Sequence, residues 1–574
     1  MKLNYLLLGA FFVIVCKTSG AQTGEITGRV VYEDGGGAPN VSVTLISVKT
    51  RQEAANIGSS AGKVITDEDG KFKFTDLKRG VYAFNVSGSK GYVKESEAEA
   101  QEQRRYRIGD NVTITLIRGG VITGRVATAD GEPMIGVRVY PVMVRDAEGQ
   151  RVRRQSGAPP RMTDDRGVYR IYGLEPGTYV VYARPESLVA PVSPYEGNVA
   201  TYHPSSTRDT AIELNVASGA EVAGVDIRYH GARGRVVSGT VAGLKEPRST
   251  GSFAQVSLAN LSTGQVLAVE GVTGANAFAI YGVPDGEYEI SARRTDFNSA
   301  EILASAPRRV TVRGADVTGI ELRLAPMASI SGKILFEAAQ NTCEKERKAT
   351  LEEVSLSARR NEGGAVEPSS LLDQEGAAND RGEFSIYNLQ AGRYFIESTL
   401  PSESWFVKSI TANAPSTANA RGSARPSAST EIARGGVALK SGEKLTGVTL
   451  TVAGGAASLR GKVAAESDSA KLPPRLRIHL IPAEATARDE VLRYAEATVR
   501  GDGTFALNNI APGKYWLISR AATDDEPGDK QPMPLAWDGD ERAKLRREAE
   551  ALKIEVEMKA CQRLIDQVIQ YSSK

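Results

Sequence analysis

The sequence is poor in the residue types on which most enzyme active sites depend. Its 574 residues include only three histidines, three cysteines and three tryptophans. His203, His230 and His479 lie far apart, and none begins an H-x-x-E or H-E-x-x-H motif of the kind that binds zinc in peptidases. A Walker loop and a dinucleotide fingerprint are also lacking. The sequence therefore predicts no metal site, no cofactor and no catalytic residues, and we interpret the chain as a non-enzyme.

Long hydrophobic runs and an excess of charge of one sign are lacking too. The one long apolar run, residues 6–16, follows Lys2 and precedes Ala21, a pattern typical of a signal peptide at residues 1–21. Without this segment the 71 basic residues fall to 69 and balance the 69 acidic ones. Balanced charge gives no reason to expect nucleic acid or an anionic membrane as a partner. We expect an exported chain without a transmembrane span after signal removal, in a periplasmic, outer-membrane-associated or extracellular location.

What the chain does contain is a repeat with fixed spacing. Gly167 is followed two residues later by Tyr169, ten residues later by Gly177 and twelve residues later by Tyr179. The same frame, with phenylalanine in place of the first tyrosine, begins at four other positions, which are Gly70, Asn276, Gly382 and Gly503. Asparagine tolerates the left-handed backbone conformation better than most residues, so Asn276 is a conservative replacement for the glycine. Five copies at identical spacing identify a repeat protein.

Each repeat predicts short strands separated by turns. Polar residues ending in glycine, such as Asp164 to Gly167, form the turn, and apolar and polar residues alternate from Val168 to Tyr172. Upstream of each copy lie an I-x-G-x-V run and a V-x-V-x-L run, and a further β-like segment separates the modules. The I-x-G-x-V runs begin at Ile26, Ile122, Val237, Ile330 and Leu459. About six or seven short strands per repeat predict an antiparallel β-sandwich.

These motifs resemble carboxypeptidase regulatory-like domains over most of the chain, from about Gly24 to Ala521. Such domains are transthyretin-like (prealbumin-like) sandwiches, often grouped with carbohydrate-binding-like folds. The resemblance implies the fold alone. The family takes its name from an accessory domain of metallocarboxypeptidases, and this name implies no peptidase activity here.

We predict an all-β tandem array of five sandwich modules with a short C-terminal helix near 538–552. The expected divisions are a signal peptide at 1–21, modules at 22–117, 118–230, 231–325, 326–453 and 454–522, and a helix with closing strands at 523–574. A low-complexity insert is expected at 411–435 in the fourth module. Residues 95–107 are highly charged and predict a short helix or a solvated loop. Cys343 and Cys561 either pair in an oxidising compartment or remain free, buried thiols.

Two sets of aromatic residues need separate interpretations. The tyrosine that closes each repeat predicts a tyrosine corner, in which the buried ring and a hydroxyl-to-backbone hydrogen bond fix the sandwich. Aromatic residues that do not repeat are the candidates for ligand binding. They are Trp405, Phe406, Trp516, Trp537 and Tyr202. Such rings could stack on sugars; alternatively they pack against neighbouring modules, which is the interpretation that we favour.

The sequence thus favours a non-catalytic exported protein that binds or scaffolds. Its loops and edge strands would contact a polysaccharide or a cell-envelope protein. The alternative is a purely structural stalk or spacer, and a peptidase or other hydrolase is the least favoured reading. Fold does not establish function, and the sequence leaves the ligand and the oligomeric state open.

Overall fold

A computed structural model describes the chain between residues 24 and 571. It leaves out residues 49–59, 88–90, 96–104, 148, 150–151, 153–157, 185–196, 245–251, 263–265, 273–275, 297–301, 338–342, 344–347, 361–374, 414–428, 466–471, 474–475 and 522–533. The expected signal peptide lies outside the described residues, as does most of the expected insert. The structure is a tandem array of five β-sandwich modules with one short α-helix among the described residues, which confirms the predicted fold class.

Modules 1 and 2 form the N-terminal part of the array. The strands of module 1 are β1 (Gly24–Tyr32), β2 (Ser42–Ser47), β3 (Ser60–Ile65), β4 (Lys71–Leu77), β5 (Tyr82–Ser87), β6 (Tyr92–Lys94) and β7 (Asn111–Arg118). Module 2 contains β8 (Gly120–Thr128), β9 (Arg138–Asp146), β10 (Arg161–Met162), β11 (Val168–Leu174), β12 (Gly177–Arg184), β13 (Thr201–Tyr202), η1 (Arg208–Thr210), β14 (Leu214–Val216), β15 (Glu221–Val222) and β16 (Ile227–Tyr229). The sheets of module 1 have the orders β4-β1-β7-β6 and β3-β2-β5.

Modules 3 and 4 repeat this plan. Module 3 contains β17 (Arg235–Ala242), β18 (Ser252–Asn260), β19 (Val266–Gly271), β20 (Ala277–Val283), β21 (Gly286–Asp296), β22 (Leu303–Ser305), β23 (Arg308–Val312) and β24 (Val317–Pro326). Module 4 contains β25 (Ala328–Phe336), η2 (Leu351–Glu353), β26 (Ser355–Arg360), β27 (Glu375–Ala377), β28 (Glu383–Leu389), β29 (Gly392–Thr399), β30 (Trp405–Asn413), β31 (Ser429–Glu431), β32 (Val437–Leu439) and β33 (Lys444–Gly454). The sheets of module 4 have the orders β28-β25-β33-β30-β31 and β27-β26-β29-β32.

Module 5 is completed by the C-terminal tail. It contains β34 (Ala457–Ala464), β35 (Leu476–Pro482), η3 (Ala485–Ala487), η4 (Val491–Arg493), β36 (Ala495–Thr498), β37 (Thr504–Ile510), β38 (Gly513–Ala521), η5 (Leu535–Trp537), α1 (Gly539–Leu552), β39 (Glu555–Met558) and β40 (Arg563–Gln570). Its sheets have the orders β37-β34-β40 and β36-β35-β38-β39. No helix in the described part of the chain has the length and apolar character needed to cross a bilayer.

One pairing pattern recurs in every module. The I-x-G-x-V strand pairs antiparallel with the strand that follows the repeat turn and parallel with the last strand of the module. In module 1 these partners of β1 are β4 and β7, and in module 5 the partners of β34 are β37 and β40. The parallel pair is a feature that the alternation of apolar residues did not predict, because a period of two does not encode strand direction.

The repeat motif has a local physical basis in all five modules. The first residue of each frame has a left-handed backbone, with φ of 77° at Gly70, 73° at Gly167, 58° at Asn276, 76° at Gly382 and 84° at Gly503. This confirms the prediction that Asn276 substitutes for glycine in the turn.

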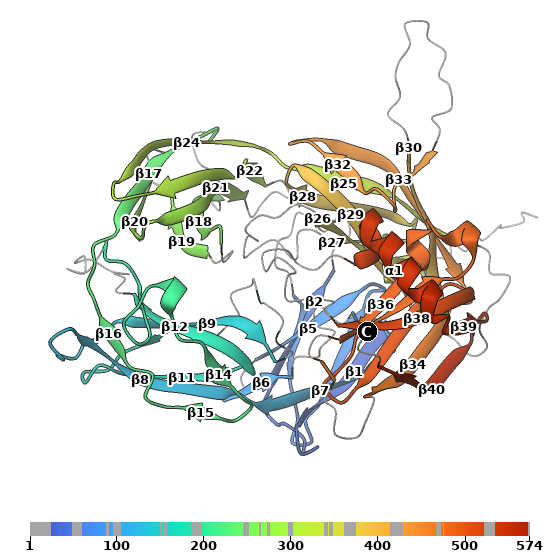
Figure 1. The fold of residues 1–574 in the computed structure, drawn as a ribbon, viewed down its shortest axis with the longest axis horizontal. Helices are drawn as coiled ribbons and strands as arrows, with labels where there is room; N and C mark the ends of the chain where they lie inside the picture. The colour runs from blue at the N-terminus through green and yellow to red at the C-terminus, as the bar shows by residue number, and fades with distance from the viewer. Residues whose placement is uncertain are drawn as a thin grey trace, which may run out of the picture.

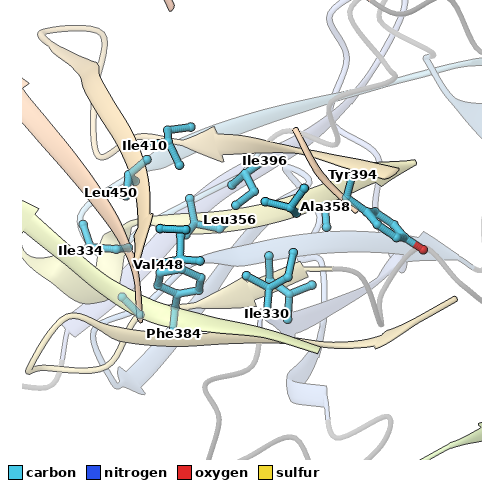
Figure 2. Packing of buried hydrophobic residues seen from close by; sticks show 14 of the residues in the cluster. Ile330, Ile334, Leu356, Ala358, Phe384, Tyr394, Ile396, Ile410, Val448 and Leu450 are labelled. Atoms are coloured by element: carbon cyan, nitrogen blue, oxygen red, sulfur yellow. The ribbon is translucent and has the colours of Figure 1, made fainter. Parts of the chain in front are cut away.

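The closing tyrosines form the predicted corners. The ring of each is at most 4% exposed, and its hydroxyl donates to the carbonyl oxygen four residues earlier at 2.5–2.9 Å. The five residues are Tyr82, Tyr179, Tyr288, Tyr394 and Tyr515. Figure 2 shows Tyr394 beside the core of module 4, where Ile330, Leu356 and Phe384 from facing strands pack together.

Helix α1 covers part of the outer face of module 5. Its N-terminus is capped by Asp538, whose carboxylate accepts hydrogen bonds from the backbone N–H groups of Asp540 and Glu541. Leu545 and Ala549 are buried against Ile481 and Ile518 of strands β35 and β38. The helix thus turns an outward sheet face into a second, small core.

Candidate functional site

Trp405 and Phe406 lie on β30, close to the junction of modules 4 and 5. The Trp405 ring stacks on Phe336, with 4.6 Å between ring centroids and 28° between planes. Its backbone carbonyl accepts a hydrogen bond from the Asn509 side chain of module 5. Phe406 is half-buried. This pair belongs to a packed strand rather than to a loop that presents rings to solvent.

Trp516 points to the outer face of β38, as strand alternation predicted, but helix α1 covers it. The Arg546 guanidinium lies 5.0 Å from the centroid of the indole ring and donates hydrogen bonds to the carbonyl oxygens of Pro482 and Ala483. A cation over an indole face is a favourable contact. The face of Trp516 is therefore occupied by the protein's own arginine.

Trp537 connects the C-terminal segment to module 4. Its ring stacks on Phe395 with 4.6 Å between centroids and 16° between planes. It also lines a cavity of about 30 Å³ together with His479, Glu496 and Tyr494. That volume accommodates a water molecule and not a sugar ring.

Tyr202 is only 5% exposed, so it cannot act as a stacking platform for a ligand. Its ring centroid lies 5.0 Å from that of Tyr182, which in turn stacks on Tyr140 at 4.9 Å. The structure therefore uses the candidate aromatic residues as packing elements and does not assemble them into one exposed face.

The two cysteines in the described part of the chain form a disulfide. Cys343 of module 4 is joined to Cys561, which lies in the turn before β40. The closed loop spans a sequence separation of 218 residues. The disulfide therefore ties the last strand of module 5 to the neighbouring module, as one of the two readings of the sequence proposed.

A serine–histidine contact in module 2 is the arrangement most like a catalytic one among the described residues, and no motif in the sequence indicated it. Ser205 Oγ lies 3.0 Å from His230 Nε2. The hydroxyl donates to the Arg228 carbonyl at 2.6 Å, while the same histidine nitrogen lies 2.8 Å from the Ser205 carbonyl oxygen, a contact in which only the nitrogen can donate. A general base must accept the serine proton instead. Both side chains therefore bind backbone carbonyl oxygens, and His230 does not activate Ser205 as a nucleophile.

Among the described residues no group of three or more histidine, cysteine, aspartate or glutamate side chains could hold a metal ion. His479 lies against Glu496, with 3.5 Å between Nδ1 and the carboxylate, and is 3% exposed. His203 contacts the Asp226 carbonyl at 2.6 Å. Each histidine is thus held by a different local contact.

A second repeated feature lies at the junctions between modules, and the spacing of the sequence motifs did not reveal it. In modules 2 to 5 the strand that follows the repeat turn (β11, β20, β28 or β37) has a left-handed residue at its penultimate position. This residue contacts the preceding module or the linker to it. These residues are Gly173, Gly282, Asn388 and Asn509, with φ of 73°, 69°, 60° and 59°. A Cβ placed on Gly282 would lie 2.5 Å from the Asn198 carbonyl oxygen.

In the last two junctions the asparagine side chain makes the contact. Asn388 Oδ1 accepts a hydrogen bond from the Ile302 backbone at 3.2 Å. Asn509 Nδ2 donates to the carbonyl oxygens of Ser402 at 2.9 Å and Trp405 at 2.8 Å. A left-handed residue therefore lies at each of these four junctions, and in the last two its side chain binds the preceding module.

Module 1 returns to contact module 4. Arg105 pairs with Glu375, both side chains being about 10% exposed, with 3.0 Å between Nε and Oε1. Arg107 is 8% exposed and donates to the carbonyl oxygens of Glu353 and Leu400. Figure 1 shows the resulting closed path, in which the first module lies beside the fourth. We call these five residues the clasp.

The clasp corrects the expectation for residues 95–107. Residues 96–104 lie outside the described part of the chain, but the Arg105 side chain is only 11% exposed and Arg107 is buried at the same interface, so neither is solvated. A run of charged residues is solvated only when its side chains interact with water and counter-ions rather than with other groups of the protein. The partners here are 246 to 293 residues away in the sequence, so composition could not reveal them.

Comparisons with known proteins add little to this geometry. No known protein family matches the chain, and no curated relative was found. The solved structures that are similar include the minor pilin GBS52 of Streptococcus agalactiae, with 15% identity, a TM-score of 0.20, and coverage of 40% of this chain and 99% of the pilin. They also include the major pilin BcpA of Bacillus cereus, with 10% identity, a TM-score of 0.14, and coverage of 53% and 99%. The Bacillus anthracis TIE protein has 10% identity, a TM-score of 0.15, and coverage of 76% of both chains. These values are too low to carry an argument about function.

Proposed function

We propose that this chain is an exported, non-catalytic scaffold that holds five β-sandwich modules in a fixed, closed arrangement and binds a protein partner of the cell envelope. The observation that carries the proposal is the clasp, because it joins modules that are distant in sequence. A spacer that sets distance needs contacts between successive modules only. A contact from module 1 to module 4 shortens the molecule instead.

The buried pairing in the clasp makes the closed arrangement sensitive to the loss of one partner. A surface ion pair contributes about 0–1 kcal/mol, whereas removing one partner of a buried pair costs about 3–5 kcal/mol because a charge is left buried and unpaired. Arg105 and Glu375 are close to the buried case, and the Ser355 hydroxyl also donates to Glu375 at 2.8 Å. Loss of Arg105 would therefore leave Glu375 buried and unpaired in the closed arrangement and would favour opening, which returns that carboxylate to water.

The non-catalytic part of the proposal is supported by the geometry of the side chains that chemistry would need. The Ser205 hydroxyl and His230 are committed to backbone carbonyls, and the cavity beside His479 is too small for a substrate. Binding through the candidate aromatic residues is not favoured either, since their faces are packed. The exposed sheet edges remain as the surfaces for a partner.

Small-angle X-ray scattering of residues 22–574 tests the arrangement. Modules with a radius of gyration of about 13 Å each give a total of about 33 Å in the closed arrangement and about 50 Å in a straight row. We expect the smaller value for the native chain and an increase toward the larger one for the double variant Arg105→Ala, Arg107→Ala.

The matched control is the double variant Arg29→Ala, Lys73→Ala, which removes the same charge from exposed positions that interact within module 1. Its scattering should equal that of the native chain. A native radius near 50 Å would overturn the scaffold proposal and favour the stalk or spacer.

A further inference from the structure

The last strand of each module has an outer edge that faces away from its parallel partner. An uncovered edge presents backbone N–H and C=O groups to any other strand. In three modules an antiparallel strand of the same chain covers at least part of this edge. The covering strands are β6 on β7, β22 on β24 and β30 on β33.

Module 2 covers the same edge with a loop, which explains the serine–histidine contact. The Arg228 N–H of β16 donates to the Pro204 carbonyl at 2.8 Å, and the Arg228 carbonyl accepts from the Ser205 hydroxyl at 2.6 Å. His203 Nδ1 contacts the Asp226 carbonyl beside it. All four upstream modules therefore cover at least part of this edge internally, although in modules 1 and 3 the covering strand pairs only with Leu116–Arg118 and Leu324–Pro326.

Module 5 differs. Strand β40 is the last strand in the sheet order β37-β34-β40, and in the described part of the chain no other strand pairs with it. On the same strand Ile565 is 62% and Val568 is 67% exposed. The side-chain amide of Gln567 donates a hydrogen bond to the Ile565 carbonyl oxygen at 3.3 Å, so this one carbonyl group of the strand already has a partner.

The bulge in β40 does not block pairing beyond it. Asp566 has a left-handed backbone with φ of 57°, where the register between β34 and β40 shifts. Gly319 of β24 and Gly447 of β33 are left-handed at the equivalent positions, with φ of 72° and 75°. Both of those strands are covered after the bulge, from Leu324 and from Val448 onward.

We propose that the edge of β40 at Gln567–Gln570 binds an extended segment of a partner protein as an added antiparallel strand, in the way that β30 binds β33. This inference rests on the proposed scaffold function and names its binding surface. Val568 pairs with Lys462 of β34, and Thr449 pairs with Lys333 of β25. Because the two lysines occupy the same position in the first strand of their modules, Val568 is equivalent to Thr449.

The alignment also defines the chemistry of the partner. In β30, Ile410 and Ala412 face the core and Thr411 pairs with Thr449. The partner segment therefore has alternating apolar residues on its inner face. The residue opposite Val568 is itself apolar and β-branched, because such cross-strand pairs stabilise a sheet.

The probe is a fluorescein-labelled peptide with the sequence of Trp405–Asn413, carrying valine in place of Thr411. Fluorescence anisotropy with the full chain 22–574 should give saturable binding. The Val568→Lys variant should weaken it about fivefold or more, since lysine on an edge opposes strand addition. The Ile65→Lys variant, which changes another apolar residue that is 65% exposed, should bind as the native chain does.

A second peptide with proline at position 411 lacks the backbone N–H that faces the paired strand, since the neighbouring Ile410 N–H of β30 points to the other side, toward Glu431, and this peptide should not bind. Circular dichroism establishes that each variant is folded. No binding of the first peptide, or equal binding to Val568→Lys, would overturn the proposal. Self-association of the chain that Val568→Lys abolishes would overturn it in favour of a second copy as the occupant. A compact chain by scattering that binds no peptide refutes this site alone, whereas an extended chain refutes the scaffold.

Discussion

Asn509 combines two properties that a pair of substitutions can separate. Its backbone is left-handed, with φ of 59°, and its side chain donates two hydrogen bonds to module 4. The Asn509→Gly variant keeps the backbone conformation and removes the hydrogen bonds. The Asn509→Ala variant removes the hydrogen bonds and also places a Cβ in the left-handed region.

The expected magnitudes follow from these contacts. A hydrogen bond contributes about 0.5–1.5 kcal/mol, and the lower end applies because Asn509 is exposed and water can replace the amide. We therefore expect Asn509→Gly to lower the free energy of unfolding of modules 4 and 5 by about 1 kcal/mol. The left-handed conformation costs a further 1–2 kcal/mol or so for alanine, giving a loss of about 2–3 kcal/mol for Asn509→Ala.

The chain offers a selective assay, because its three tryptophans, Trp405, Trp516 and Trp537, all lie in modules 4 and 5. Urea unfolding followed by tryptophan fluorescence reports on these modules. With a slope of about 2 kcal/mol per M, the midpoint should fall by about 0.5 M for Asn509→Gly and by about 1 M or more for Asn509→Ala. Equal midpoints for Asn509→Gly and the native chain would refute a role for the amide, and equal losses for both variants would refute the backbone argument.

Two further predictions concern single positions. Asp566→Gly should raise the urea midpoint slightly, by the equivalent of about 0.5–1 kcal/mol, because glycine occupies the equivalent bulges of β24 and β33, whereas Asp566→Val should lower it. An unchanged midpoint for Asp566→Val would contradict the assigned backbone strain. Burial raises the pKa of the Tyr169 hydroxyl far above its ordinary value near 10, and the Asp226 charge adds to this effect. Because the folded pKa is the higher one, the stabilisation is complete below about pH 10 and is lost as the pH rises above it. Thermal unfolding between pH 9 and pH 11 should show this loss, and Tyr169→Phe, which introduces the residue found at this position in the other four modules, should show less of it.

The repeat, the turns and the corners could be predicted because each depends on residues close in the sequence. A left-handed turn position selects glycine or asparagine whatever surrounds it, so Asn276 could be read directly. The i−4 hydrogen bond of Tyr394 likewise lies within one corner. Alternation predicted the outward direction of Trp516, because side chains alternate on any strand.

The covering of that outward face could not be predicted in the same way. Alternation says which side a residue points to, but not what packs on that side. Helix α1 and Arg546 cover Trp516, and Phe395 of another module covers Trp537. The candidate aromatic residues were therefore found correctly as large apolar groups, while their availability to a ligand depended on elements elsewhere in the chain.

The sequence by itself determined that this protein is a series of five β-sandwiches, because turn chemistry and a period of two act over a few residues. The tertiary structure alone decided how the series closes and which sheet edge is left open. Arg105 and Glu375 meet across 270 positions, and the edge of β40 is distinguished only by comparison with the other four modules, in which at least part of the equivalent edge is covered. Such contacts depend on how whole modules pack, and the energy that holds them has no periodic signature in the sequence.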